Sequence, residues 1–272
     1  MTLSDEEKLI QQEACQYIKE HEAELIEKFI TSKKPLPLGF ATIFMAGSPG
    51  AGKTEFSRRY IPLLVDKGDT RLQEHFKKRG ADINDFEALL VIIDVDEIRG
   101  FLPQYRKTDV TTGQKGNSHV VQKAAGKGLD ILREHCLKNE ISFLHDGTFG
   151  NFDTMRDLVR KSIAGGRQVH IFYIYLDPLS AWEFTKAREA LEGRNIVKEK
   201  FIEQYIQSRK NVDAIKQEFG EKIRLNVILK NSKNEVEDIQ LNVPSLDQFL
   251  KTQYNKGTVK EYSAEELIEV IK

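Results

Sequence analysis

Short apolar runs alternate with longer amphipathic segments through the middle of the chain. Each run is rich in Val, Ile and Phe, and a run that is apolar on both faces is typical of a strand buried in a parallel sheet. Alternation of such strands with helical segments predicts an α/β fold, doubly wound, with a mainly parallel five-stranded sheet flanked by helices. The runs are ATIFMA (41–46), ALLVIID (88–94), ISFLHD (141–146), VHIFYIYL (169–176) and IRLNVIL (223–229).

Helical patterns flank this alternation at both ends. Apolar residues recur at helical period through residues 4–31, and Ser4 and Glu7 have the spacing of a capping box. The tail after Val243 has the pattern of two short helices. We therefore expect three parts: a helical extension at 1–35, a core at 36–232 with a charged insertion at 66–87, and a C-terminal extension at 233–272 that packs on the core.

Composition narrows the class of protein. The 41 Lys and Arg residues nearly balance the 42 Asp and Glu residues, whereas a protein that binds nucleic acid usually carries a basic excess. The longest apolar runs have six residues, far fewer than the roughly 20 that span a bilayer. The acidic N-terminus does not resemble a secretory signal. We expect a cytoplasmic protein that binds neither nucleic acid nor membrane, with Cys15 and Cys136 as free thiols, although one disulfide is an alternative.

A glycine-rich loop follows the first predicted strand. The segment GSPGAGKT fits the P-loop pattern G-x-x-x-x-G-K-[ST], and it lies between a strand and a helix, which is the context that the pattern requires. Glycines let the backbone curl so that its N–H groups face phosphate oxygens, and the helix N-terminus adds a positive dipole end. We expect Lys53 to reach the β- and γ-phosphates of ATP, and Thr54 to bind Mg²⁺. The residues expected to bind ATP are Gly47, Ser48, Pro49, Gly50, Ala51, Gly52, Lys53 and Thr54.

Two groups of carboxylates follow later strands. Ligands of doubly wound sheets bind beyond the carboxyl ends of the strands, and Asp94 and Asp96 lie at one such end. One of them can hold Mg²⁺ through water, and the other can accept a proton from an attacking hydroxyl. Alternatively, both belong to a turn and a helix cap. The second group, Asp146 and Thr148, belongs to an Asp-Gly-Thr step, which is either part of the same site or a plain turn.

Arginines are the third kind of candidate, because phosphoryl transfer needs cations on the transferred group. Arg188 falls on the helix predicted after the fourth strand, and Arg194 follows a glycine. This arrangement suits a segment that closes over ATP. The alternative is that both arginines are solvated charges.

Together these motifs resemble the zeta toxin family of P-loop kinases. The resemblance rests on the P-loop, on the string Asp96-x-x-Arg99-x-x-x-Pro103-x-Tyr105, and on the Asp-Gly-Thr step at Asp146. Arg188 and Arg194 fall where that family places its phosphate-binding arginines. The matching elements span residues 47 to about 210.

The resemblance implies a reaction and roles. It implies an ATP- and Mg²⁺-dependent kinase, and it makes Asp96 the general base, with Lys53, Arg188 and Arg194 also catalytic. It implies transfer of the γ-phosphoryl group to a hydroxyl of a sugar nucleotide such as UDP-N-acetylglucosamine, and an antitoxin partner. Thr54 and Asp94 would bind the metal. The residues implied to bind the acceptor are Arg99, Tyr105, Asp130, Asp146 and Thr148.

Two departures from the family bear on the acceptor. Asp146 stands where well-known members have Glu, and Asp130 matches the expected carboxylate only loosely. One alternative is therefore a nucleoside, nucleotide or antibiotic kinase on the same fold. Another is a regulatory P-loop ATPase switch, although the chain has no Asn-Lys-x-Asp motif of a GTPase.

Overall fold

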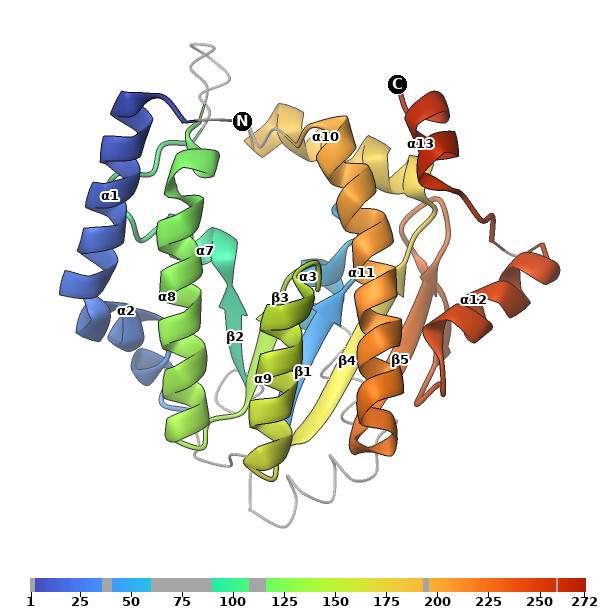
Figure 1. The fold of residues 1–272 in the computed structure, drawn as a ribbon, viewed down its shortest axis with the longest axis horizontal. Helices are drawn as coiled ribbons and strands as arrows, with labels where there is room; N and C mark the ends of the chain where they lie inside the picture. Colours follow the sequence, from blue (N-terminus) through green and yellow to red (C-terminus); the bar gives the residue numbers. More distant parts are fainter. Residues whose placement is uncertain (1–2, 36–40, 60–89, 108–115, 193–195, 258) are drawn as a thin grey trace. The chain divides into compact units, whose positions relative to one another are not determined.

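The protein is described from a computed structural model, which covers residues 3–35, 41–59, 90–107, 116–192, 196–257 and 259–272 (Figure 1). The chain divides into two compact units. The first comprises residues 1–39, 65–144 and 188–195, and the second comprises residues 40–64, 145–187 and 196–272. The charged insertion predicted at 66–87 lies outside the described residues, and the predicted domain boundaries stay predictions.

A twisted sheet forms the centre of the second unit. Its strands are adjacent in the order β1-β4-β5-β6, and β1, β4 and β5 are parallel. Every residue of β1 is buried, as expected for a strand covered on both faces. The predicted mainly parallel α/β architecture is confirmed. The strands are β1 (Ala41–Ala46), β4 (Gln168–Tyr175), β5 (Ile223–Lys230) and β6 (Val236–Gln240).

The prediction of five strands missed β6. Across the described residues the structure has six strands, and β6 pairs antiparallel with β5. None of the side chains of β6 is fully buried. The strand can therefore accommodate Glu and Asp between its apolar residues. A half-exposed strand of this kind does not form the continuous apolar run that marks the other strands.

Helices cover the sheet of the second unit. Helix α9 packs on β4, and α11 packs on β1 and β5; Figure 1 shows α9 and α11 running alongside each other. The two C-terminal helices α12 and α13 both contact α11. Lys198 Nζ, at the start of α11, donates a hydrogen bond of 2.8 Å to Ile271 O just after α13. The helices are α3 (Lys53–Arg59), α9 (Phe152–Ala164), α10 (Pro178–Glu192), α11 (Lys198–Phe219), α12 (Leu246–Asn255) and α13 (Ala264–Val270).

The N-terminal helical segment is interrupted once. Helix α1 (Asp5–Glu20) begins with the predicted capping box between Ser4 and Glu7, and α2 (Glu22–Phe29) follows it. His21 separates them with a φ of −113° and a ψ of 29°. Its ring stacks on that of Tyr17 at a centroid distance of 3.8 Å. The single helix expected over residues 4–31 is therefore two helices, followed by the short 3-10 helix η1 (Thr31–Lys33).

Helix α8 (Ser118–Lys138) is the packing centre of the first unit. It contacts α1, α2, β2 (Val91–Asp94) and α7 (Val95–Arg99). Gly128 permits this packing, because a Cβ there would lie 2.8 Å from Ile98 Cγ2. Strand β3 (Phe143–Asp146) is adjacent to β2 and runs from the first unit into the second.

Cys15 and Cys136 are both buried and free, as expected. Among the described helices, none is both long and apolar enough to cross a bilayer.

Candidate functional site

The loop between β1 and α3 has the conformation that its three glycines permit. Gly47, Gly50 and Gly52 have φ values of 132°, 74° and 71°, a region that side-chain-bearing residues rarely adopt. A Cβ on Gly47 would lie 2.5 Å from Ile174 O, and one on Gly52 would lie 2.5 Å from Lys230 Nζ. Surrounding groups therefore pack against the loop, and its backbone is curled in the manner that binds anions.

Helix α11 anchors the beginning of the loop. The Gly47 N–H donates a hydrogen bond of 2.9 Å to Ser208 Oγ, and it lies 3.5 Å from Thr148 O. Ser208 is fully buried. One helical turn further, Asn211 Nδ2 donates to Phe149 O at 2.9 Å. The same helix thus holds both the P-loop and the Asp-Gly-Thr step, which sequence reasoning had placed in one crevice.

The P-loop lysine lies over its own loop. Lys53 Nζ donates hydrogen bonds to Ser48 O at 2.6 Å and to Gly47 O at 3.2 Å. The ammonium group is therefore held against the backbone of the loop, and a polyphosphate bound there would need such a cation. Thr54, the next residue, is half-buried.

The turn between β5 and β6 contacts the other end of the loop. Lys230 is the last residue of β5, and its Nζ lies 3.4 Å from Gly52 O and 2.9 Å from Asn234 Oδ1. Asn234 Nδ2 in turn donates to Glu55 Oε2 at 3.3 Å. Burial lowers the pKa of Lys230, and the charge of Glu55 partly opposes this shift.

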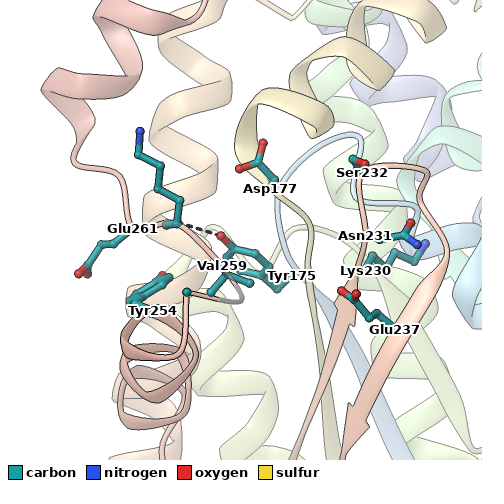
Figure 2. A pocket seen from close by; sticks show the side chains of 11 residues that line it. Tyr175, Asp177, Lys230, Asn231, Ser232, Glu237, Tyr254, Val259 and Glu261 are labelled. Carbon is teal, nitrogen blue, oxygen red and sulfur yellow. Dashed lines mark hydrogen bonds between the residues drawn. The ribbon is translucent and has the colours of Figure 1, made fainter.

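A pocket of about 620 Å³ opens at the carboxyl ends of β4 and β5 (Figure 2). This volume is within the range of sites for small ligands. One wall is the β5–β6 turn, and the opposite wall is the segment after α12. The lining residues are Tyr175, Asp177, Lys230, Asn231, Ser232, Glu237, Tyr254, Gly257, Val259, Lys260 and Glu261.

Hydrogen bonds hold the C-terminal wall of the pocket in place. Tyr175 OH donates to Lys260 O at 3.0 Å. Arg209, on α11, donates to Tyr254 OH at 2.9 Å and to Asp247 Oδ1 at 2.6 Å. Burial raises the pKa of Tyr254 to about 12, so its hydroxyl stays protonated near neutral pH and can act as a donor as well as an acceptor.

The Asp-Gly-Thr step ends β3. Asp146 is buried, and Thr148 is half-buried. His145, which precedes the step, packs edge-on against Phe44 of β1 with a centroid distance of 6.2 Å, so its ring belongs to the packing of the core. The closeness of Thr148 to Gly47 supports the expectation that this step lies at the P-loop.

The first carboxylate pair lies at the start of α7 in the first unit. Asp94 caps this helix, because its Oδ1 accepts a hydrogen bond of 2.8 Å from the Asp96 N–H. Asp96 Oδ1 pairs with Arg99 Nη1 at 2.5 Å, and Arg99 also donates to Gln122 of α8. The helix-cap alternative is therefore observed for Asp94. Asp96 has a carboxylate that is paired with a guanidinium group, and its role as a general base stays a prediction.

Other predicted site residues have more local partners. Asp130 pairs with Arg133 on the same helix at 2.9 Å, and its side chain is exposed. Tyr105 is half-buried in the loop after α7 and donates its N–H to Leu102 O. Arg188 is exposed on α10, whereas Arg194 lies outside the described residues.

The residues present fit a Mg²⁺ ion that is held mainly by nucleotide phosphates. Such an ion keeps several waters and needs only one or two protein oxygens, and Thr54 offers one hydroxyl. Within the described part of the chain, no cluster of three His, Cys, Asp or Glu side chains could hold a metal by itself. The role of Asp94 in metal binding stays a prediction.

Comparison with protein families decides the assignment. A family model described as zeta toxin matches residues 67–242, more than half of the chain. The chain belongs to the zeta toxin family. The matched range begins after residues 47–54, so the P-loop of this zeta toxin family member is a separate observation that agrees with the match.

Solved structures agree with this fold. The PezAT toxin–antitoxin system of Streptococcus pneumoniae has a chain that is 17% identical with a TM-score of 0.54, and the alignment covers 99% of this chain and 95% of that chain. A structure of AvrRxo1-ORF1:-ORF2 with ATP is 13% identical with a TM-score of 0.55, covering 93% and 74%. At these identities the likeness shows the fold alone. Comparison with curated proteins gives no match.

Sequence reasoning missed three residues around the P-loop of this family member. Ser208 carries no local signal, because its partner Gly47 is 161 positions away in the sequence. Asn234 bonds Lys230 four residues away, but its link to α3 is through Glu55, 179 positions away. Lys230 carries a weak one, since a lysine that ends an apolar strand is unusual unless its charge has a partner or a function.

Proposed function

We propose that this zeta toxin family member is an ATP-dependent kinase that transfers the γ-phosphoryl group to a hydroxyl of a sugar nucleotide such as UDP-N-acetylglucosamine. The observation that carries the proposal is the P-loop itself. Its three glycines have positive φ, and Lys53 Nζ is held over the curled backbone. A pocket large enough for a nucleoside opens at the ends of the neighbouring strands β4 and β5.

The donor nucleotide would occupy the second unit. Its phosphates would lie in the loop at 47–54, next to Lys53, and its nucleoside would enter the pocket between the β5–β6 turn and Tyr254. Mg²⁺, when bound beside Thr54, would neutralise charge on the transferred group. The structure with ATP among the AvrRxo1-ORF1 neighbours supports ATP as the donor.

The acceptor hydroxyl would lose its proton to Asp96. The ion pair with Arg99 keeps the Asp96 carboxylate in one orientation, which is a requirement for a general base. Arg188 and Arg194 would neutralise the transferred phosphoryl group. Arg99, Tyr105, Asp130, Asp146 and Thr148 would bind the acceptor. Catalysis of this kind depends on positioning and charge, since the phosphoryl group needs little covalent chemistry from the protein.

A protein partner is part of the proposal. The PezAT structure is described as a toxin–antitoxin system, and AvrRxo1-ORF1 is described in complex with AvrRxo1-ORF2. We propose by analogy that an antitoxin protein binds this chain.

The test is a phosphotransfer assay with a panel of acceptors. Wild-type protein is incubated with Mg-ATP and UDP-sugars, nucleosides, nucleotides or aminoglycosides, and mass spectrometry detects products heavier by one phosphoryl group. Asp96→Asn should lower turnover by about 10²–10⁴-fold, the usual contribution of a general base, while ATP binding is retained. Asp153→Asn, a change at an exposed position on α9, is the matched control.

Each outcome separates one part of the proposal from the rest. A phosphorylated nucleoside or antibiotic with untouched UDP-sugars would overturn the acceptor and favour the alternative kinase class. ATP hydrolysis that is equal in wild type and Asp96→Asn, without any phosphorylated acceptor, would favour a regulatory switch.

A further inference from the structure

Lys230 is a buried cation between the P-loop and the pocket. Only 5% of its surface is exposed. It is one of the pocket-lining residues on the wall that the β5–β6 turn forms (Figure 2), and its Nζ lies 3.4 Å from Gly52 O. The P-loop and the pocket are thus joined through one side chain.

The turn that carries Lys230 is tightly built. Asn231 Oδ1 accepts hydrogen bonds of 3.0 Å from the N–H groups of both Lys233 and Glu235. Asn234 has a left-handed φ of 65°, and its N–H donates to Asn231 O at 2.9 Å. This geometry fixes Asn234 Oδ1 as the acceptor of Lys230 Nζ, so the ammonium group has a defined position.

The hydrogen-bond partners of this ammonium group are neutral, and they are fewer than its three N–H donors. A lysine has three N–H donors, and Lys230 directs them to one amide oxygen at 2.9 Å and one distant carbonyl at 3.4 Å. None of the described carboxylates forms an ion pair with it. A buried cation that no carboxylate pairs with directly is costly. Burial lowers the pKa of Lys230, and the more distant charge of Glu55 opposes this shift only in part. A bound anion would remove this cost.

We infer that Lys230 is a nucleotide-binding residue that contacts the donor where its ribose joins the α-phosphate. The inference rests on the proposed function. With phosphates in the loop and the nucleoside in the pocket, the ribose-phosphate junction is the part of the nucleotide that passes Lys230. On binding, the long contact to Gly52 O is exchanged for a charge-assisted hydrogen bond to the nucleotide.

The test is a binding series with adenosine, AMP, ADP and ATP, measured by calorimetry or by competition. Lys230→Met should lower the affinities for AMP, ADP and ATP by a common factor of about 10–100, the range for hydrogen bonds to charged groups. The affinity for adenosine should change by less than about twofold. Lys230→Gln keeps a donor for Asn234 and Gly52 but carries no charge, so it should show the same pattern. Lys230→Arg should recover part of the affinity.

Lys216 supplies a matched control. It is a second buried lysine of the same unit, on α11, with Nζ hydrogen bonds of 3.0 Å to Gly220 O and Ile223 O. Burial lowers its pKa as well, but it does not line the pocket. Lys216→Met should leave the affinities for all four ligands unchanged.

The outcomes distinguish this inference from the proposed function. Equal losses for adenosine and ATP, or full recovery by Lys230→Gln, would show a merely structural role and overturn the inference. Unchanged ATP affinity in folded Lys230→Met would do the same and leave the kinase assignment intact. A wild-type protein that binds none of the phosphorylated nucleotides would overturn both.

Discussion

Ser208→Ala removes the hydroxyl that anchors the P-loop and leaves the residues of the loop unchanged. The hydroxyl of Ser208 accepts the Gly47 N–H at 2.9 Å and is fully buried, so water cannot replace it. The remaining acceptor, Thr148 O, lies at 3.5 Å, the limit of a hydrogen bond. A buried donor left without a good partner costs about 1–3 kcal/mol, and we expect the free energy of unfolding to fall by that amount.

The matched control is Ser162→Ala on α9. Ser162 is also fully buried, but its hydroxyl donates to Leu158 O within its own helix. This carbonyl keeps a backbone donor of the helix when the hydroxyl is removed, so we expect a cost below about 1 kcal/mol. The two variants thus remove the same atom from equally buried sites with different consequences for a backbone group.

Urea denaturation followed by circular dichroism measures the difference in stability. ATP affinity measured on the same proteins reports on the loop, and Ser208→Ala should weaken it, because Gly47 is free to turn its N–H away. The reasoning would be refuted if Ser208→Ala were no more destabilising than Ser162→Ala and bound ATP as tightly as wild type.

Two further predictions follow from the second unit. Gly50→Ala should reduce ATP affinity at least tenfold, because its Cβ would meet Ala181 O and Thr185 Oγ1 and an alanine in the left-handed region costs about 1–2 kcal/mol. Gly166 has a similar φ with nothing within 4 Å of a Cβ, so the control variant Gly166→Ala should bind ATP normally. Equal ATP affinities of the two variants would contradict the prediction. Alkaline pH should also lower the free energy of unfolding. Burial raises the pKa of Tyr205 well above its ordinary value of 10, so above pH 10 the folded state keeps a proton that the unfolded state loses. The stability is fully present below pH 10 and is lost progressively as pH rises from there to the raised pKa of the folded state. The urea midpoint of unfolding should therefore decrease as pH rises above 10, and this decrease should be smaller in Tyr205→Phe. An equal decrease in that variant would argue against Tyr205 as its cause.

Features with local causes could be predicted from the sequence. The capping box of Ser4 and Glu7 depends on residues three apart, and the strands β1, β4 and β5 are marked by their own apolar runs. The P-loop is similar, because its glycine spacing sets its backbone conformation. The exceptions were also local: β6 has too many charged residues to form an apolar run, and the break at His21 interrupts a helix whose apolar period continues across it.

The surroundings of the P-loop could not be predicted, because they depend on contacts between distant residues. Ser208 is 161 positions from Gly47, and Lys230 is 178 positions from Gly52. A serine inside a helix and a lysine at the end of a strand gain these roles only when the parallel order of β1, β4 and β5 brings their ends together. The P-loop pattern therefore identifies the kind of ligand, whereas the residues that fix the loop and read the rest of the nucleotide emerge only from the folded chain. Substitutions at Ser208 and Lys230, rather than at the glycines, therefore test what the folded chain adds to the P-loop pattern.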